Sequence, residues 1–242
     1  MIFLRGLRWA AGLTALVALL PLVALFTALG GRHFATRNWC ALALRIFRIR
    51  VRVRGEIPAP GSFVAMNHLS YFDPIVAGSV LPGRFIAKEE VSRWLLAGLV
   101  ARTGRVVFID RTSARRSQQT LMKVAGILAG KESALVFAEG GIRGDGDKIA
   151  PFLPMLFEAV VRAQGPVVPL AIKYLRPADP SVWRWGEGSM FEHLLKKVLG
   201  AGEILVELRF GDPIVPGREQ NRKELAFLAH KAVSELYSGA AE

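Results

Sequence analysis

Cysteine is almost absent from this 242-residue chain, and acidic residues are missing from its first part. The one cysteine, Cys40, excludes an intramolecular disulfide and fits a reducing compartment. Residues 1–55 contain nine arginines but no aspartate or glutamate, whereas the remainder is nearly balanced in charge. A nucleic-acid-binding protein usually spreads basic residues over a folded face. Here the arginines flank an apolar segment, which indicates a lipid surface with anionic headgroups and not nucleic acid.

Charge of either sign is missing from residues 9–31, a run of 23 residues. As a helix, at ~1.5 Å per residue, this run is about 35 Å long, enough to cross a hydrocarbon core of ~30 Å. A cleaved signal peptide would have a shorter apolar region and a small-residue cleavage site. We therefore expect a membrane helix, which Pro21 would kink or make re-entrant. The arginines that follow it predict an inner (cytoplasmic) membrane protein whose remaining chain lies on the cytoplasmic face.

Residues 34–47 have the pattern of an amphipathic helix. Trp39, Leu42, Ala43 and Ile46 share one face, and arginines occupy the other side. This stripe either lies in the membrane surface or packs on the folded protein. We expect residues 1–55 to be membrane-anchoring helices and residues 56–242 to be one α/β domain.

Short apolar runs alternate with helical patterns after residue 48. The predicted strands are 48–54, 62–66, 84–87, 105–109, 134–138, 167–174 and 203–210, and the predicted helices are 74–81, 91–101, 113–130, 154–164, 190–199 and 221–237. Asn221 and Glu224 have the spacing of a capping box at the start of the last helix. Strand–helix alternation predicts an α/β fold with a mixed, largely parallel sheet of about seven strands flanked by helices.

Polar residues follow four consecutive predicted strands. These residues are Asn67-His68, Lys88-Glu89, Asp110-Arg111 and Glu139-Gly140. In open α/β sheets, ligands bind beyond the carboxyl ends of the strands. The sequence therefore predicts a binding site at this edge, in which Lys88 and Arg111 either bind an anion or form surface ion pairs with Glu89 and Asp110.

The heptapeptide "NHLSYFD" (67–73) places His68 five residues before Asp73. Asp73 precedes Pro74, so one interpretation is that its carboxylate caps a helix. Alternatively, if the intervening segment is a turn, the carboxylate can orient the imidazole of His68, which then accepts a proton from a hydroxyl group. Ser70 is not in a nucleophile elbow. A substrate hydroxyl activated by His68 would attack a thioester directly, because a thiolate is a good leaving group.

These residues resemble the Asn-His-x-x-x-x-Asp signature of the glycerolipid acyltransferase superfamily. The blocks "GRVVFIDR" (104–111), "FAEG" (137–140) and "VVPLAIKY" (167–174) follow in the order of that family, so the resemblance covers about residues 55–215. The third block departs from the family pattern, since Ala138 replaces a proline and the arginine is displaced to Arg143. The continuation "GDGDKIAPFLPMLFEAV" resembles the bacterial branch that includes lyso-ornithine lipid acyltransferases.

The resemblance implies an O-acyltransferase of membrane phospholipid biosynthesis that needs no cofactor. Its donor substrate would be acyl-CoA or acyl carrier protein, and its acceptor 1-acylglycerol-3-phosphate or a related lysophospholipid. Lyso-ornithine lipid is the alternative acceptor, and a serine-dependent lipid hydrolase using Ser70 is a further alternative. His68 would be the general base and Asp73 its orienting partner. The residues expected to bind substrate are Asn67, Ser70, Lys88, Arg111, Glu139, Gly140 and Arg143. Asp145 and Asp147 are too few for a calcium loop, so no metal is expected.

Overall fold

The computed structural model describes residues 2–143, 148–185, 189–217 and 219–239. Its strands form a seven-stranded sheet in the order β1-β7-β6-β2-β5-β3-β4. They are β1 (Ile49–Arg54), β2 (Phe63–Met66), β3 (Arg84–Lys88), β4 (Val107–Ile109), β5 (Ala134–Phe137), β6 (Val167–Arg176) and β7 (Ile204–Phe210). All pairs from β6 through β2, β5 and β3 to β4 are parallel. The predicted mixed, largely parallel sheet is confirmed, and each apolar run contributes one strand.

The predicted helices are present with small shifts of their ends. They are α1 (Ile2–Ala18), α2 (Leu20–Ala28), α3 (Arg32–Ile46), α4 (Asp73–Gly78), α5 (Leu95–Thr103), α6 (Ala114–Ala129), α7 (Phe157–Ala163), α8 (Met190–His193) and α9 (Arg222–Ser238). Helix α8 continues into a π-helical turn at Leu194–Val198, where the sequence predicts an ordinary helix. The predicted capping box is confirmed, because Asn221 accepts the N–H groups of Lys223 and Glu224 at the start of α9.

Contacts group the chain into two units. Unit 1 comprises Met1–Arg52, Leu69–Leu81 and Tyr174–Glu207, and unit 2 comprises Val53–His68, Pro82–Lys173 and Leu208–Glu242. The predicted boundary at residue 55, between membrane-anchoring helices and the α/β domain, stays a prediction.

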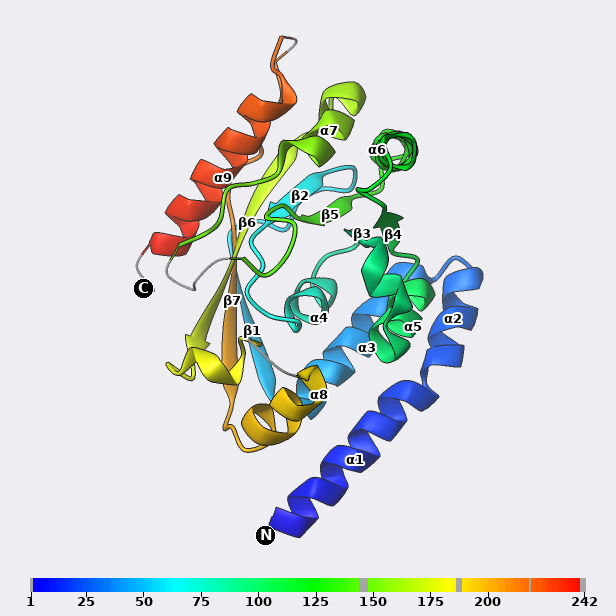
Figure 1. The fold of residues 1–242 in the computed structure, drawn as a ribbon, viewed down its shortest axis with the longest axis vertical. Coiled ribbons are helices and arrows are strands. Elements are labelled where there is room, and N and C mark those ends of the chain that lie inside the picture. Colours follow the sequence, from blue (N-terminus) through cyan, green and yellow to red (C-terminus); the bar gives the residue numbers. More distant parts are fainter. Residues whose placement is uncertain (1, 144–147, 186–188, 218, 240–242) are drawn as a thin grey trace. The chain divides into compact units, whose positions relative to one another are not determined.

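In unit 1, the uncharged run forms two helices joined end to end (Figure 1). Leu19 separates α1 from α2, because Pro21 has no N–H to donate to the Val17 carbonyl. The kink that Pro21 predicts is therefore present. The segment Trp9–Ala28 has a mean hydropathy of 2.2 and, by length and composition, could cross a membrane.

Helix α3 packs its apolar stripe within unit 1. The indole N–H of Trp39 donates to the Leu16 carbonyl of α1 at 3.0 Å. Ala43 is fully buried, and a Cβ on Gly12 of α1 would lie 2.9 Å from the Ile46 side chain. The stripe therefore packs against α1, and its predicted contact with either the membrane surface or the α/β domain stays a prediction.

In unit 2, one face of the sheet carries the hydrophobic core. Phe63 and Ala65 of β2 are fully buried among apolar side chains of α6, α7 and α9, which lie side by side in Figure 1. The same face includes Val136 of β5. Because side chains alternate along a strand, Phe137 lies on the opposite face, and its ring stacks on that of Phe85 with centroids 6.0 Å apart.

Removal of residues 1–31 should detach most of the protein from membranes. The truncation removes the whole uncharged run but keeps the arginines of α3 and β1, whose attraction to anionic headgroups is screened by salt. A small bound fraction should therefore remain at low salt and be released at high salt. Membrane sedimentation of the full chain and the truncated chain tests this. Retention of the truncated chain at high salt would contradict it.

Candidate active site

Four parallel strands of unit 2 end at the same edge of the sheet. β2 pairs with β5 from Phe63↔Ala134 to Met66↔Phe137, and β3 pairs in parallel with β5 and β4. This edge is where open α/β sheets bind ligands. The polar residues that follow these strand ends are Asn67, His68, Lys88, Arg111, Glu139 and Gly140.

A buried carboxylate fixes the backbone of His68. Glu139 is 0% exposed, and its Oε1 accepts the His68 N–H at 2.7 Å. Its Oε2 accepts the N–H of Ala150 at 2.9 Å. Both oxygens bind backbone, so Glu139 joins two loops and positions His68. This differs from the substrate contact that the sequence predicts.

Asn67 is also used inside the fold. It is fully buried, its Oδ1 accepts the Ile172 N–H at 2.7 Å, and its Nδ2 donates to the Ile172 carbonyl at 3.0 Å. The side-chain amide thus pairs with the backbone of β6 as another strand residue would. Asn67 fixes the chain just before His68, and the contacts of this buried amide are with the backbone of Ile172, which is a structural role and not the predicted substrate contact.

The imidazole of His68 stacks on the ring of Phe137, with centroids 4.1 Å apart and planes inclined by 21°. Two other histidines have structural contacts. His193 bonds to Tyr71 and to the Ser181 carbonyl, and His230 contacts the Ile149 carbonyl. His68 is the histidine at the ligand-binding edge of the sheet.

Two glycines bring cationic side chains against the loop after β5. Gly140 and Gly141 have φ values of +75° and +155°, which side chains rarely adopt. A Cβ on Gly140 would lie 2.6 Å from Nη1 of Arg111, and one on Gly141 would lie 3.4 Å from Nζ of Lys88. The structure therefore gathers Arg111, Lys88 and this loop in one place, as a binding site for an anion requires.

The charges at this loop favour an anion. Partial burial and the nearby positive charge of Arg143 lower the pKa of Arg111, and Glu90 opposes this change. Asp110 pairs with Arg116 at 2.9 Å, so it is not the ion-pair partner of Arg111. Among the described residues, no ion pair involves Lys88, Arg111 or Arg143. The surface ion-pair interpretation of Lys88 and Arg111 is wrong for the described chain.

Asp73, in unit 1, does not cap a helix. It is the first residue of α4, whose N-terminus has no side-chain cap. Its Oδ2 accepts the N–H groups of Leu69 and Ser70 at 2.6 and 2.8 Å, and its Oδ1 accepts the hydroxyl of Tyr174 at 2.7 Å. Burial and the charge of Asp73 raise the pKa of Tyr174, which keeps this hydroxyl protonated. The carboxylate turns back to the preceding loop, so the capping interpretation is wrong.

Ser70 is fully buried, and its hydroxyl donates to the Trp183 carbonyl at 2.5 Å. The same oxygen accepts the Phe72 N–H at 3.2 Å. A hydroxyl held in this way is not presented to a substrate. The contacts support neither the predicted substrate binding by Ser70 nor its use as a nucleophile.

The segment between His68 and Asp73 is a turn, which is the condition that a His–Asp pair requires. The Asp73 N–H donates to the Ser70 carbonyl at 3.1 Å, and the Asp73 carboxylate binds the two residues that follow His68 in the chain. His68 belongs to unit 2 and Asp73 to unit 1. The catalytic pairing of the two side chains stays a prediction.

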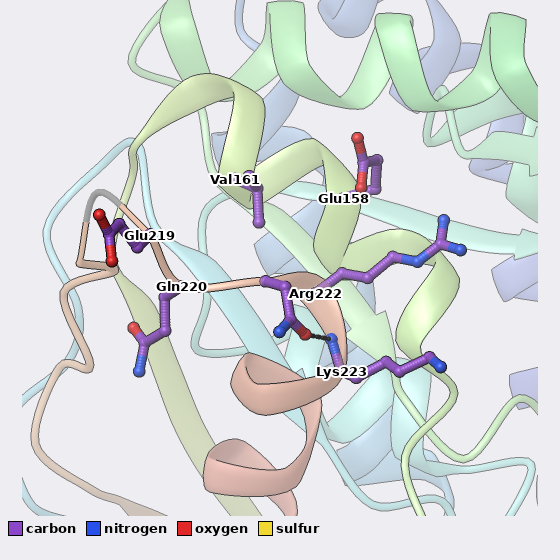
Figure 2. A pocket seen from close by; sticks show the side chains of 7 residues that line it. Glu158, Val161, Glu219, Gln220, Arg222 and Lys223 are labelled. Carbon is purple, nitrogen blue, oxygen red and sulfur yellow. Dashed lines mark hydrogen bonds between the residues drawn. The ribbon is translucent and has the colours of Figure 1, made fainter.

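A separate cavity of about 530 Å³ lies in unit 2 at the start of α9. It is lined by Glu158, Val161, Glu219, Gln220, Asn221, Arg222 and Lys223 (Figure 2). The first N–H groups of α9 are bound by Asn221, and none of the predicted site residues lines the cavity. We therefore do not assign it to the active site.

Within the described part of the chain, no group of three or more His, Cys, Asp or Glu side chains could hold a metal ion. Asp145 and Asp147, considered above for calcium, lie outside the described residues. Two contributors to the site had no role in the sequence prediction, namely Phe137 and Tyr174. Both lie in apolar runs that predict strands, so the sequence indicated that they are buried. It gave no sign of the polar residues that they contact in the structure.

Comparison with known proteins gives consistent matches. The family model described as Acyltransferase matches residues 48–173. The lyso-ornithine lipid O-acyltransferase of Brucella abortus (strain 2308) is 30% identical in an alignment covering 96% of this chain and 92% of that protein. The 1-acyl-sn-glycerol-3-phosphate acyltransferase of Neisseria gonorrhoeae is 32% identical in an alignment covering 51% of this chain and 52% of that protein. The crystal structure of the 1-acyl-sn-glycerophosphate acyltransferase of Thermotoga maritima covers 100% of both chains with a TM-score of 0.68 and 21% identity, which supports the fold.

Gly140→Ala should destabilise the protein by about 1–3 kcal/mol, because a side chain at this φ is strained and its Cβ would lie 2.5 Å from Leu153 and 2.6 Å from Arg111. The matched control is Gly126→Ala in α6, where a Cβ meets no atom within 4 Å. There the change should be neutral or stabilising by up to ~1 kcal/mol. Denaturant unfolding in detergent measures both, and equal stabilities would contradict the strain assigned to Gly140.

Asp73→Asn should fold but lose most activity. Asparagine can still accept the N–H groups of Leu69 and Ser70, while its Nδ2 donates to the Tyr174 oxygen, so the loss of stability should stay below ~1.5 kcal/mol. A neutral amide cannot stabilise an imidazolium. Asp73→Ala, the contrasting variant, leaves buried donors unpaired and should cost at least ~3 kcal/mol. A fully active Asp73→Asn enzyme would limit Asp73 to a structural role.

Proposed function

This chain belongs to the acyltransferase family, and we propose that it transfers a fatty acyl group from a thioester donor to the free hydroxyl of lyso-ornithine lipid. The main prediction from the sequence was 1-acylglycerol-3-phosphate as acceptor, with lyso-ornithine lipid as the alternative. Of the two relatives compared by sequence, the one named for lyso-ornithine lipid aligns along nearly the whole chain, whereas the one named for 1-acyl-sn-glycerol-3-phosphate aligns along half of it. This difference favours the alternative.

The observation that carries the proposal is the position of His68 at the ligand-binding edge of the sheet, with its backbone N–H bound to Glu139. In the proposed reaction, the imidazole takes the proton of the acceptor hydroxyl as its oxygen attacks the thioester carbonyl. The carbon–sulfur bond then breaks, and the leaving thiolate receives the proton from the imidazolium. The products are the ester and the free thiol of acyl carrier protein or coenzyme A. Asp73 orients the imidazole and stabilises its protonated form.

The cations at the loop after β5 suit the acceptor headgroup. Lys88, Arg111 and Arg143 offer positive charge, and Arg111 offers a fork of two parallel N–H donors. An ornithine headgroup carries a carboxylate, which this fork matches, and also an ammonium group. Glu90 lies near enough to raise the pKa of Arg111 and offers the opposite charge for that ammonium. A phosphate headgroup would use the cations alone.

The N-terminal helices support a reaction at a membrane, which we include in the proposal. Trp9–Ala28 is long and apolar enough to cross a bilayer, and the arginines that follow it favour the cytoplasmic side of an inner membrane. A lyso-lipid acceptor resides in that membrane, so the enzyme would meet it there. The donor, whether acyl carrier protein or acyl-CoA, would arrive from the cytoplasm.

The test is to incubate the full-length protein with lyso-ornithine lipid and 1-acylglycerol-3-phosphate, each with both donor types, and to identify the products by mass spectrometry. Acylated ornithine lipid should be the dominant product, and His68→Ala should abolish its formation. Preferential acylation of 1-acylglycerol-3-phosphate would reverse the proposed acceptor. An active His68→Ala enzyme would exclude His68 as the base.

Arg111→Ala should lower kcat/KM for the acceptor about 10-fold or more, because a hydrogen-bonded contact between a cation and an anion contributes ~1.5–3 kcal/mol. Arg111→Lys keeps the charge but loses the fork, so it should also show a clear loss. Arg115→Ala, on the exposed side of α6, is the matched control and should leave kcat/KM unchanged. Steady-state kinetics with the acceptor varied measure these effects. If both Arg111 variants have the acceptor kinetics of the wild type, Arg111 does not bind the acceptor headgroup.

A further inference from the structure

The stack between His68 and Phe137 has no role in the reaction described so far. The two rings are nearly parallel, with planes inclined by 21° and centroids 4.1 Å apart. A face-to-face stack leaves the nitrogen atoms on the ring edge, where a hydroxyl or a carboxylate can reach them. The contact therefore fixes the plane of the imidazole without using its ring nitrogens.

The position of Phe137 is fixed by the sheet itself. Phe137 pairs with Met66 across the parallel strands, and the next N–H, that of Ala138, donates to the Met66 carbonyl at 2.9 Å. The Phe137 ring also stacks on Phe85 of β3, with planes inclined by 11° and centroids 6.0 Å apart. Phe137 is thus in ring contact with both His68 and Phe85 in unit 2.

The face of a phenyl ring carries partial negative charge and attracts a cation placed over it. In the proposed reaction the His68 imidazole accepts the proton of the acceptor hydroxyl and becomes a cation. An interaction that grows as the imidazole becomes protonated stabilises the transition state more than the ground state, which is what accelerates a reaction.

We infer that Phe137 is a positioning residue of the acyl transfer, whose ring holds the His68 imidazole in plane and stabilises its protonated form. This inference rests on the proposed function, since it takes His68 to be the base. It assigns to the phenylalanine of "FAEG" an electrostatic part in the reaction in addition to its packing.

Charged groups around the imidazole come from several elements. Glu139 binds the backbone N–H of His68, Lys88 ends β3, Arg111 follows β4, and Asp73 is the predicted partner of the ring. A test of the Phe137 ring must therefore keep every one of these charges unchanged. Fluorination of the phenyl ring does so, because it withdraws electron density from the ring face and hardly changes the shape.

The experiment replaces Phe137 in the full-length protein with 4-fluoro-, 3,5-difluoro- and 3,4,5-trifluorophenylalanine. With increasing fluorination, kcat should fall progressively, by about 3- to 10-fold at trifluorophenylalanine, with little change in KM. Because the fluorinated ring attracts the protonated imidazole less strongly, that form becomes less stable and the imidazole loses its proton at a lower pH. The acidic limb of the pH profile of kcat should therefore move to lower pH, by about 0.5 to 1 pH unit at the end of the series.

A second readout does not depend on activity. The titration of the His68 ring, followed by NMR of labelled histidine and assigned by its absence in His68→Asn, should move in the same direction as the acidic limb. The same substitutions at Phe85, which stacks on Phe137, are the matched control and should move the titration far less. A purely structural role of Phe137 would leave kcat and both titrations close to those of the unsubstituted protein, because fluorination hardly changes the shape of the ring.

Two failures can be told apart. If fluorination leaves kcat and the His68 titration unchanged while His68→Ala is inactive, the inference about Phe137 is overturned and the proposed function stands. If His68→Ala retains activity, His68 is not the base, and both the proposed function and the inference about Phe137 are overturned. Equal shifts in the Phe85 and Phe137 series would also overturn the inference, because they would show a general effect of fluorination.

Discussion

The candidate site depends on the buried carboxylate of Glu139. A charge without exposure to water is tolerated inside a protein when its oxygens accept hydrogen bonds, and here the N–H groups of His68 and Ala150 supply them. The first contact fixes the loop after β2, and the second fixes the segment that follows the loop after β5. One side chain thus determines the separation between the histidine and the loop that carries Gly140 and Gly141. Lys88 of β3 and Arg111, which follows β4, can gather at this loop because the loop is held in place.

Asn67 and Asp73 act on the same stretch of chain in the same manner. Asn67 joins the end of β2 to the backbone of Ile172, and Asp73 binds the N–H groups of Leu69 and Ser70. With Glu139, which binds the His68 N–H, they give three successive backbone N–H groups, those of residues 68 to 70, a side-chain partner, and they anchor residue 67 to β6. Asn67 and Asp73 of "NHLSYFD" therefore position the chain, and His68 is the residue that we propose as the base.

The fold could be predicted in detail because its signals are local. Each strand is a short apolar run, and the period of the helices can be read within a single segment. The partners of Asn67 and Glu139 could not be predicted, since they lie 105 and 71 residues away in sequence. The capping interpretation of Asp73 failed for the related reason that a helix-start pattern does not reveal to which side the carboxylate turns. Phe137 looked like any other core residue of a strand until its neighbour across the sheet was known.

The pairing of Asn67 with Ile172 has a consequence for the timing of synthesis. Ile172 follows Asn67 by 105 residues, so at ~5–20 residues per second the ribosome needs about 5–20 s to supply it. Throughout that interval the N-terminal apolar helix is already available for the membrane, while the segment around His68 lacks its partner on β6. If the protein acts at a membrane as we propose, the nascent chain can reach the bilayer before the segment around His68 is complete. Delivery to the lipid surface would then precede competence for acyl transfer.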